Sequence, residues 1–202
     1  MSRDGDSRWI VQYEALLCVL NSKGQVMMWK VTPGMSFSDV EDCLRSLKKR
    51  LDSQGKLLDA FYIDNCCSWR NKLQSVFGVQ LNIYLDIFHA VKRFTETVPK
   101  CHPLSYACTS EWKMVFIARS DHGKECLYTT PSPDIPECNL NEFIQRWKDA
   151  EYDGKKLLGP KALKELGTIR IHMKKGCLSG IQPGRGTNHN ENLQSCPLQS
   201  ME

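Results

Sequence analysis

The feature that most constrains the fold is a pair of short apolar runs, each followed at once by an aspartate. Leu57 to Ile63 precedes Asp64, and Leu81 to Leu85 precedes Asp86. Runs of this length suit buried strands, and the apolar residues after each aspartate fall at helical spacing. The sequence therefore predicts strands that alternate with helices, the pattern of an α/β fold.

A hairpin and a helix are expected before these runs. Val11 to Leu20 and Gln25 to Val31 have strand character, and the turn Asn21-Ser-Lys-Gly24 suits a hairpin because Asn and Gly tolerate positive φ. Ser38 with Glu41 matches a capping box at the start of the helix. The apolar stripe of that helix comprises Val40, Leu44, Leu47 and Leu51.

The second half of the chain has weaker periodicity. Residues 100 to 138 carry many loop signals, so we expect an insertion or linker there. Asn139 is then expected to cap a further helix, in which Trp147 belongs to the core rather than to a base-stacking surface. The apolar positions of this helix are Leu140, Phe143, Ile144 and Trp147.

Composition limits the class of protein. A chain of 202 residues with 41% hydrophobic content can bury a sizeable core in one domain, or one and a part. The apolar runs fall far short of the ~20 residues that span a bilayer, and no signal-peptide pattern follows Met1. We expect a soluble protein of the nucleus or cytoplasm, neither secreted nor bound to a membrane.

The ten cysteines are expected to be reduced thiols, because a chain without a secretion signal stays in a reducing compartment. The sequence contains no Cys-x-x-Cys pair. The nearest zinc candidate, Cys101 and His102 with Cys108, lacks a fourth ligand at zinc-site spacing, so the sequence does not predict a structural zinc site.

Charge is distributed unevenly along the chain. The net charge is only +4, but residues 155 to 190 contain eight basic side chains and a single acid, Glu165. Such a stripe attracts nucleic-acid phosphates, although a solvated lysine-rich face gives the same pattern. The basic residues are Lys155, Lys156, Lys161, Lys164, Arg170, Lys174, Lys175 and Arg185.

Several acids and one histidine form a wider pattern. Asp64 is followed by Asp86-x-x-His89 and, far along the chain, by Glu191 after Gly184-Arg-Gly-Thr-Asn-His-Asn190. Together with His172-Met-Lys-Lys-Gly-Cys-Leu-Ser179, this resembles the catalytic domain of DDE transposases from eukaryotic hAT and Mutator-like elements. The resemblance covers roughly residues 9 to 191.

The resemblance implies an RNase H-like mixed sheet flanked by helices, with a largely helical or irregular insertion. It also implies that Asp64 and Glu191 are catalytic acids that hold Mg²⁺ or Mn²⁺, while Asp86 and His89 form the family's Asp-x-x-His motif. We therefore expect a partial core at 9–98, an insertion at 99–168, a returning segment at 169–191 and a disordered tail at 192–202.

The sequence departs from this family at both ends. No strand carries the family's first catalytic Asp, since Asp4 and Asp6 lie in a turn-like segment, and Pro197 would stop the helix meant to carry Glu191. We expect a truncated domain that binds DNA but lacks catalysis, with homo-oligomerisation left open. The alternatives are a domesticated nucleic-acid or protein interaction module, and an active nuclease whose first Asp is Asp4, Asp6 or a residue of a partner chain.

Overall fold

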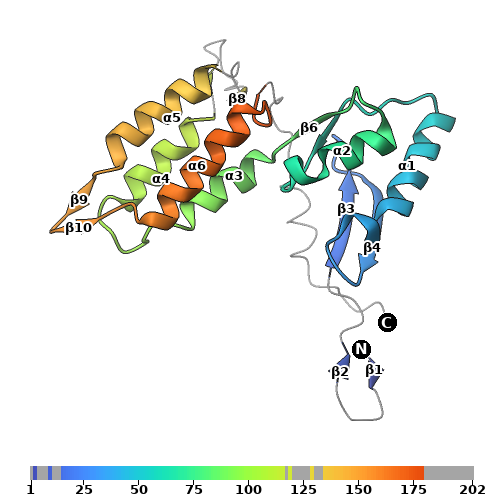
Figure 1. Cartoon of the computed structure of the whole chain (residues 1–202), viewed down its shortest axis with the longest axis horizontal. Coiled ribbons are helices and arrows are strands. Elements are labelled where there is room, and N and C mark those ends of the chain that lie inside the picture. Colours follow the sequence, from blue (N-terminus) through green and yellow to red (C-terminus); the bar gives the residue numbers. More distant parts are fainter. Residues whose placement is uncertain are drawn as a thin grey trace. The chain divides into compact units, whose positions relative to one another are not determined.

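The computed structural model describes residues 2–3, 9–10, 15–116, 118–119, 128–129 and 134–179. These residues form small sheets and six α-helices (Figure 1), which confirms the mixed α/β class. The chain divides into two compact units. The hairpin unit comprises Met1–Phe61, Ser68–Asn82 and Thr187–Glu202, and the helical unit comprises Tyr62–Cys67 and Ile83–Gly186.

The elements alternate along the chain in the predicted order β-β-α-β-α-β-α from residue 15 to residue 95. The strands are β1 (Ser2–Arg3), β2 (Trp9–Ile10), β3 (Ala15–Leu20), β4 (Val26–Thr32), β5 (Ala60–Tyr62), β6 (Asn82–Tyr84), β7 (Ala118–Arg119), β8 (Tyr128–Thr129), β9 (Glu151–Tyr152) and β10 (Lys155–Lys156). The helices are the 3₁₀-helix η1 (Phe37–Asp39) and the α-helices α1 (Glu41–Ser53), α2 (Cys66–Phe77), α3 (Ile87–Thr95), α4 (Ser105–Met114), α5 (Asp134–Trp147) and α6 (Pro160–Lys174).

The described strands pair only in twos: β1 with β2, β3 with β4, β5 with β6, β7 with β8, and β9 with β10. They do not join into the continuous mixed sheet that an RNase H-like core contains.

The β3–β4 hairpin confirms the predicted turn. The two strands are antiparallel, with Ala15 opposite Thr32, and the side chain of Asn21 accepts hydrogen bonds from the backbone N–H groups of Lys23 and Gln25, both at 2.9 Å. Gly24 has φ of 75°, a conformation that costs glycine little. Asn and Gly thus have the roles that the sequence assigns to them.

The start of α1 differs from the prediction. Ser38 and Glu41 do not form the capping box; instead the Asp39 carboxylate accepts hydrogen bonds from the backbone N–H of Ser36 at 3.1 Å and from its hydroxyl at 2.6 Å. This pair closes the turn η1 before α1 begins. Glu41 is left free for an ion pair with Arg45 one turn later, at 2.6 Å.

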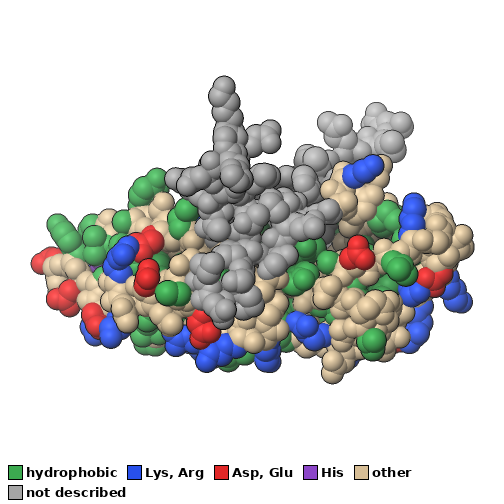
Figure 2. All heavy atoms as spheres, turned by 90° about the horizontal axis from the view of Figure 1, so that it is seen from above, with side chains coloured by type: hydrophobic (Ala, Val, Ile, Leu, Met, Phe, Trp, Pro, Cys, Tyr) green, Lys and Arg blue, Asp and Glu red, His purple; other side chains and the backbone are tan. Residues whose placement is uncertain are grey.

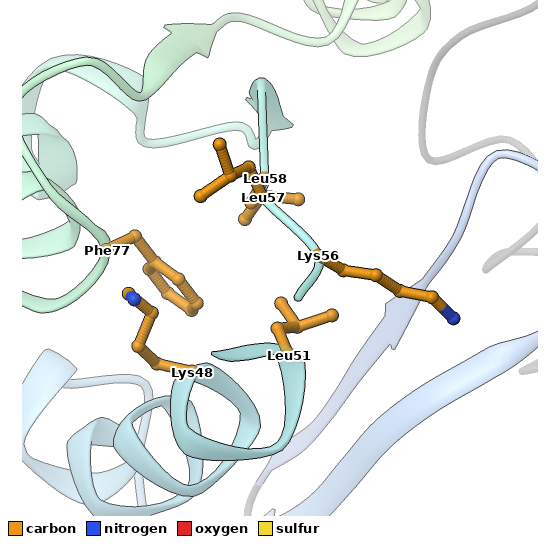
Figure 3. Close-up of a pocket in the computed structure, with 6 residues that line it drawn as sticks. All are labelled: Lys48, Leu51, Lys56, Leu57, Leu58 and Phe77. Atoms are coloured by element: carbon orange, nitrogen blue, oxygen red, sulfur yellow. The ribbon is translucent and has the colours of Figure 1, made fainter. Parts of the chain in front are cut away.

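The apolar stripe of α1 is buried as predicted, at Val40, Leu44, Leu47 and Leu51. Beside it lies a small recess (Figure 3), lined by Lys48 and Leu51 of α1, by Lys56, Leu57 and Leu58, and by Phe77 at the end of α2. Its volume of about 10 Å³ is near the minimum for one water molecule. The recess is therefore a packing defect and not a ligand site.

Strands β5 and β6 are shorter than the apolar runs predict. Leu57, inside the first run, is 76% exposed, so that run does not form one buried strand. The pairing is parallel, because Asn82 N–H donates to Asp59 C=O at 3.1 Å and Ile63 N–H donates to Tyr84 C=O at 3.0 Å, so both strands advance together. The carboxyl ends of both strands therefore meet at one edge.

The core of the helical unit is a cluster of aromatic rings supplied by α3, α4 and α5 and by Phe116, just after α4; these helices lie side by side with α6 in Figure 1. The ring centre of Trp112 lies 4.5 Å from that of Phe94, 4.9 Å from Phe116 and 5.1 Å from Phe143. Trp147 is also buried, which confirms its predicted place in the core, and its indole N–H donates to Glu111 at 3.1 Å.

One prediction for this region was wrong, and another was incomplete. Within residues 100 to 138, where we expect an insertion or linker, residues 105–114 form α4, whose buried positions Cys108 and Trp112 are interrupted by exposed apolar residues that blur the periodicity. Helix α5 starts at Asp134, so Asn139 lies inside the helix rather than at its cap. The Asn139 side chain instead donates to the backbone carbonyl of Val115 at 3.3 Å, which ties α5 to the end of α4.

We predict that Trp112→Ala lowers the free energy of unfolding of the helical unit by about 3–5 kcal/mol, because it removes the ring at the centre of the cluster. Tyr106→Ala is the matched control on the same helix, since Tyr106 is 84% exposed and should tolerate truncation. Urea unfolding followed by near-ultraviolet circular dichroism measures both. Equal, small losses in the two variants would contradict a core built on Trp112.

Candidate functional site

Asp64 lies at the carboxyl end of β5, where it contacts α3. Its Oδ2 is 3.3 Å from Nδ1 of His89, and Arg93 donates to its backbone carbonyl at 3.1 Å. The side chains of Asp64 and His89 are 39% and 21% exposed, so a ligand can reach them. The structure thus brings two of the predicted site residues together.

Asp86 lies just after the carboxyl end of β6, which pairs with β5. Its carboxylate binds a backbone N–H group at the start of α3. Asp86 is 1% exposed, and its Oδ1 accepts a hydrogen bond from Phe88 N–H at 2.7 Å as the N-cap of α3. A carboxylate at a helix N-terminus is also stabilised by the helix dipole. Asp86 therefore orients the helix that carries His89.

Asp64 and Asp86 do not by themselves make up the ligand set of a magnesium site. Mg²⁺ requires near-octahedral oxygen coordination, usually by carboxylates and water. Of the acids at this edge, Asp64 is engaged with His89 and Asp86 is buried against α3. The described part of the chain brings no third carboxylate to them. Glu191, the other predicted ligand, lies outside the described residues.

A different group of metal-type donors converges two residues beyond Asp64. It comprises Cys66, Cys67, His172 and Cys177, whose candidate ligand atoms all lie within 4.8 Å of one another. His172 Nδ1 is 3.4 Å from the sulfur of Cys66 and 3.5 Å from that of Cys67. The Cys67 sulfur is 3.7 Å from that of Cys177 and 3.9 Å from that of Cys66.

Backbone hydrogen bonds hold this Cys/His cluster in place. After α6, Gly176 adopts φ of 69°, Cys177 N–H donates to His172 C=O at 2.9 Å, and Gly176 N–H donates to Met173 C=O at 2.9 Å. This is a Schellman turn, in which glycine takes the left-handed position that ends the helix. The carbonyl of Cys177 then accepts from Leu85 N–H at 2.8 Å, which attaches the turn to the end of β6.

The environment of the thiols favours their neutral form in the absence of a cation. Hydrogen bonding to Cys177 and burial raise the pKa of the Cys66 thiol. Burial, followed by hydrogen bonding to Cys177, raises the pKa of the Cys67 thiol. Three sulfurs this close together cannot all carry negative charge unless a positive ion lies among them.

The sequence did not reveal this cluster because its parts are far apart: Cys66 and His172 are separated by 106 positions. The signals were the adjacent Cys66-Cys67 and the spacing His172-x₄-Cys177. Cys101 and His102, the zinc candidate from the sequence, do not belong to this cluster. Cys101 is exposed, and His102 Nε2 lies 3.1 Å from the backbone carbonyl of Lys155.

The predicted basic stripe is only partly available to a ligand. Lys155, Lys156, Lys161, Lys164 and Lys175 are exposed on β10, along α6 and at its end. In contrast, Arg170 donates to the Asn141 side chain at 2.6 Å, and Lys174 lies 3.8 Å from the Glu137 carboxylate. Arg185 lies outside the described residues. In the face drawn in Figure 2, basic and acidic side chains are interspersed.

An open groove on α3 and α4, which sequence reasoning missed, offers a second basic surface. Its volume is about 500 Å³, and its one acidic lining residue is Glu96. Phe88 borders it and is partly exposed, and the Lys92 ammonium lies 6.0 Å from the centre of that ring. The basic and hydroxyl residues that line the groove are Lys92, Lys100, Lys113, Thr95, Ser105 and Thr109.

Comparison with known proteins assigns neither a family nor a function. No family model, curated protein or solved structure is significantly similar to this chain. Within the part of the chain that the structure describes, no helix has the length and apolar character needed to cross a membrane. Function must therefore be inferred from the geometry of the side chains.

Proposed function

We propose that this protein is a DNA-binding domain descended from a DDE transposase, and that it does not perform DDE catalysis. The observation that carries the binding function is the groove on α3 and α4. Lysines bind phosphates as point charges, hydroxyl groups donate hydrogen bonds to phosphate oxygens, and Phe88 offers a ring on which a base can stack.

The charge of the groove supports an anionic ligand. Lys92, Lys100 and Lys113 outnumber its one acid, Glu96, so the lining has a net positive charge at neutral pH. Lys92 and Phe88 lie one turn apart on α3, where a backbone phosphate and an unstacked base could be held together. A small neutral metabolite would use neither the three ammonium groups nor the open shape.

Transposase descent is supported by the parallel pair β5–β6. An aspartate follows the end of each strand by two residues, and the second aspartate caps the helix that carries His89. On this proposal the RNase H-like sheet has been reduced to its paired fragments. The engagement of Asp64 with His89 and the burial of Asp86 support the loss of two-metal catalysis, which needs carboxylates free to bridge both ions.

A second candidate function, self-association, is favoured by the β3–β4 hairpin. Leu16 and Val31 lie opposite each other, as do Cys18 and Trp29, on one face of the hairpin. Trp29 is 66% exposed, and Leu16 and Val31 are also exposed. Exposed apolar side chains grouped on a strand pair are typical of interaction surfaces.

For the groove, we expect the full chain to bind a labelled single-stranded DNA with an affinity that falls steeply with salt, by about 0.7 log units per phosphate contact for each log unit of salt. The double variant Lys100→Ala/Lys113→Ala should bind more weakly and lose roughly two contacts from this slope. Fluorescence anisotropy across a salt series measures both. Lys49→Ala, an exposed lysine of α1, is the matched control, and a salt-independent affinity would refute the proposal.

For catalysis, we expect no nicking of supercoiled plasmid in Mg²⁺ or Mn²⁺ beyond that of Asp64→Asn. The reason is that the described carboxylates do not form a two-metal site. Gel analysis of plasmid topology after long incubation measures this. Metal-dependent nicking that disappears in Asp64→Asn would show that the protein is an active nuclease and would overturn this part of the proposal.

For self-association, we expect Trp29→Lys to shift the wild-type chain from dimer towards monomer in light scattering coupled to size-exclusion chromatography. The substitution places a charge in the middle of the exposed apolar face. Lys23→Glu, in the hairpin turn, should leave the dimer unchanged. A wild-type chain that is monomeric at all concentrations would remove this candidate.

A further inference from the structure

Four donors from two distant segments surround a common point in the helical unit. Cys66 and Cys67 begin α2, His172 lies in the last turn of α6, and Cys177 follows the turn that ends α6. Two of the thiols, those of Cys66 and Cys177, are fully buried. Three sulfurs and one imidazole nitrogen are the donor set of a structural Cys₃His zinc site.

The spacing of these donors matches such a site. For a tetrahedral zinc ion with Zn–S bonds of about 2.3 Å and Zn–N bonds of about 2.0–2.1 Å, neighbouring sulfurs lie about 3.8 Å apart and sulfur and nitrogen about 3.6 Å apart. Two of the three sulfur–sulfur separations are 3.7 and 3.9 Å, and two of the three sulfur–nitrogen separations are 3.4 and 3.5 Å. The remaining two pairs, Cys66 with Cys177 and His172 with Cys177, lie within 4.8 Å, so Cys177 is the donor that would move closer when the ion binds.

The Schellman turn positions two of the four donors before any ion arrives. Its hydrogen bond from Cys177 N–H to His172 C=O fixes the spacing between these two ligands. The bond from Leu85 N–H to Cys177 C=O holds the same turn at the strand edge near which Cys66 and Cys67 lie. The backbone positions of His172 and Cys177 are thus fixed by hydrogen bonds as well as by side-chain packing.

We propose that Cys66, Cys67, His172 and Cys177 bind one zinc ion in a closed, structural site. The soft sulfur-rich donor set selects Zn²⁺ over Mg²⁺ or Ca²⁺. All four coordination positions are filled by the protein, so the ion has no open position for a substrate. The site does not depend on the proposed DNA-binding function, because none of its ligands lines the groove on α3 and α4.

Neither a disulfide nor simple core packing would use all four side chains of the cluster. A disulfide between Cys67 and Cys177 would need the sulfurs to approach from 3.7 Å to about 2.05 Å, and it would involve neither Cys66 nor His172. If the thiols only packed in the core, the His172 imidazole would not need to lie beside their sulfurs. A metal site, in contrast, requires every one of the four donors.

The test begins with the metal content of the full chain, purified under reducing conditions without chelators. Inductively coupled plasma mass spectrometry should find about one zinc per chain. Cys177→Ser and His172→Ala should each reduce this at least fivefold. Cys101→Ser and Cys138→Ser, which change exposed cysteines, should retain it. A chain without zinc, or zinc content unchanged in Cys177→Ser and His172→Ala, would overturn the proposal.

A second measurement remains decisive if the serine and alanine variants do not fold. Replacement of zinc by Co²⁺ in the wild-type chain should give intense visible bands of a tetrahedral ion and thiolate-to-cobalt charge transfer. His172→Cys should keep the ion and strengthen the charge transfer, because a fourth thiolate replaces the imidazole. Weak octahedral bands in the wild type, or an identical spectrum in His172→Cys, would overturn the assignment of these ligands.

Thiol labelling separates the metal from the disulfide. With zinc bound, Cys66, Cys67 and Cys177 should resist alkylation and become reactive after a zinc chelator is added under denaturing conditions. If Cys67 and Cys177 instead become reactive only after a reductant, the cluster holds a disulfide and the proposal fails. A zinc-loaded wild-type chain that does not bind DNA would refute the proposed function but would not contradict the zinc site.

Discussion

The parallel pairing of β5 with β6 is the constraint on which the rest of this structure depends. Two hydrogen bonds, Asn82 to Asp59 and Ile63 to Tyr84, set the register, and they bring the chain after residue 63 next to the chain after residue 84. Both strands contribute residues to both compact units. The positions of the functional side chains near residue 64 depend on this pairing, because the end of a strand fixes where the residues that follow it lie.

Two kinds of metal-binding side chain lie near the carboxyl ends of β5 and β6: carboxylates and thiols. Their contacts favour a metal bound by the thiols. The carboxylates of Asp64 and Asp86 already have protein partners, His89 and the N-terminus of α3. The sulfurs of Cys66, Cys67 and Cys177 have mainly one another and His172. Hard oxygen ligands suit Mg²⁺ and soft sulfur ligands suit Zn²⁺, so the donors that remain available at this edge select the softer ion.

Sequence reasoning succeeded for most locally determined elements, although the caps at Ser38 and Asn139 did not form, and it failed for most features that depend on distant residues. The hairpin turn follows from Asn21 and Gly24, and the α1 stripe follows from leucines at helical spacing, so both could be predicted. Helix α4 could not, because its buried face includes Cys108 and its exposed face includes Tyr106 and Met114. Its helical character becomes visible only once Trp112 has the rings of α3 and α5 as partners.

The candidate site shows the same division, since no local pattern indicates that His172 meets Cys66. Only the docking of α6 against α3 and the hydrogen bond from Leu85 to Cys177 bring them together.

A metal at this cluster would compensate for a weakness in the fold. The described strands form only two-stranded pairs, which are marginal by themselves in water. A cross-link that closes a loop of about 100 residues removes conformational freedom from the unfolded chain worth about 4.7 kcal/mol in the chain-entropy treatment of disulfides. Cys67 and Cys177 are separated by 110 positions, so an ion between them closes a loop of this size. It would fix the segment that enters the helical unit to the end of α6, and it would hold Asp64 and the start of α3 in register without a wider sheet.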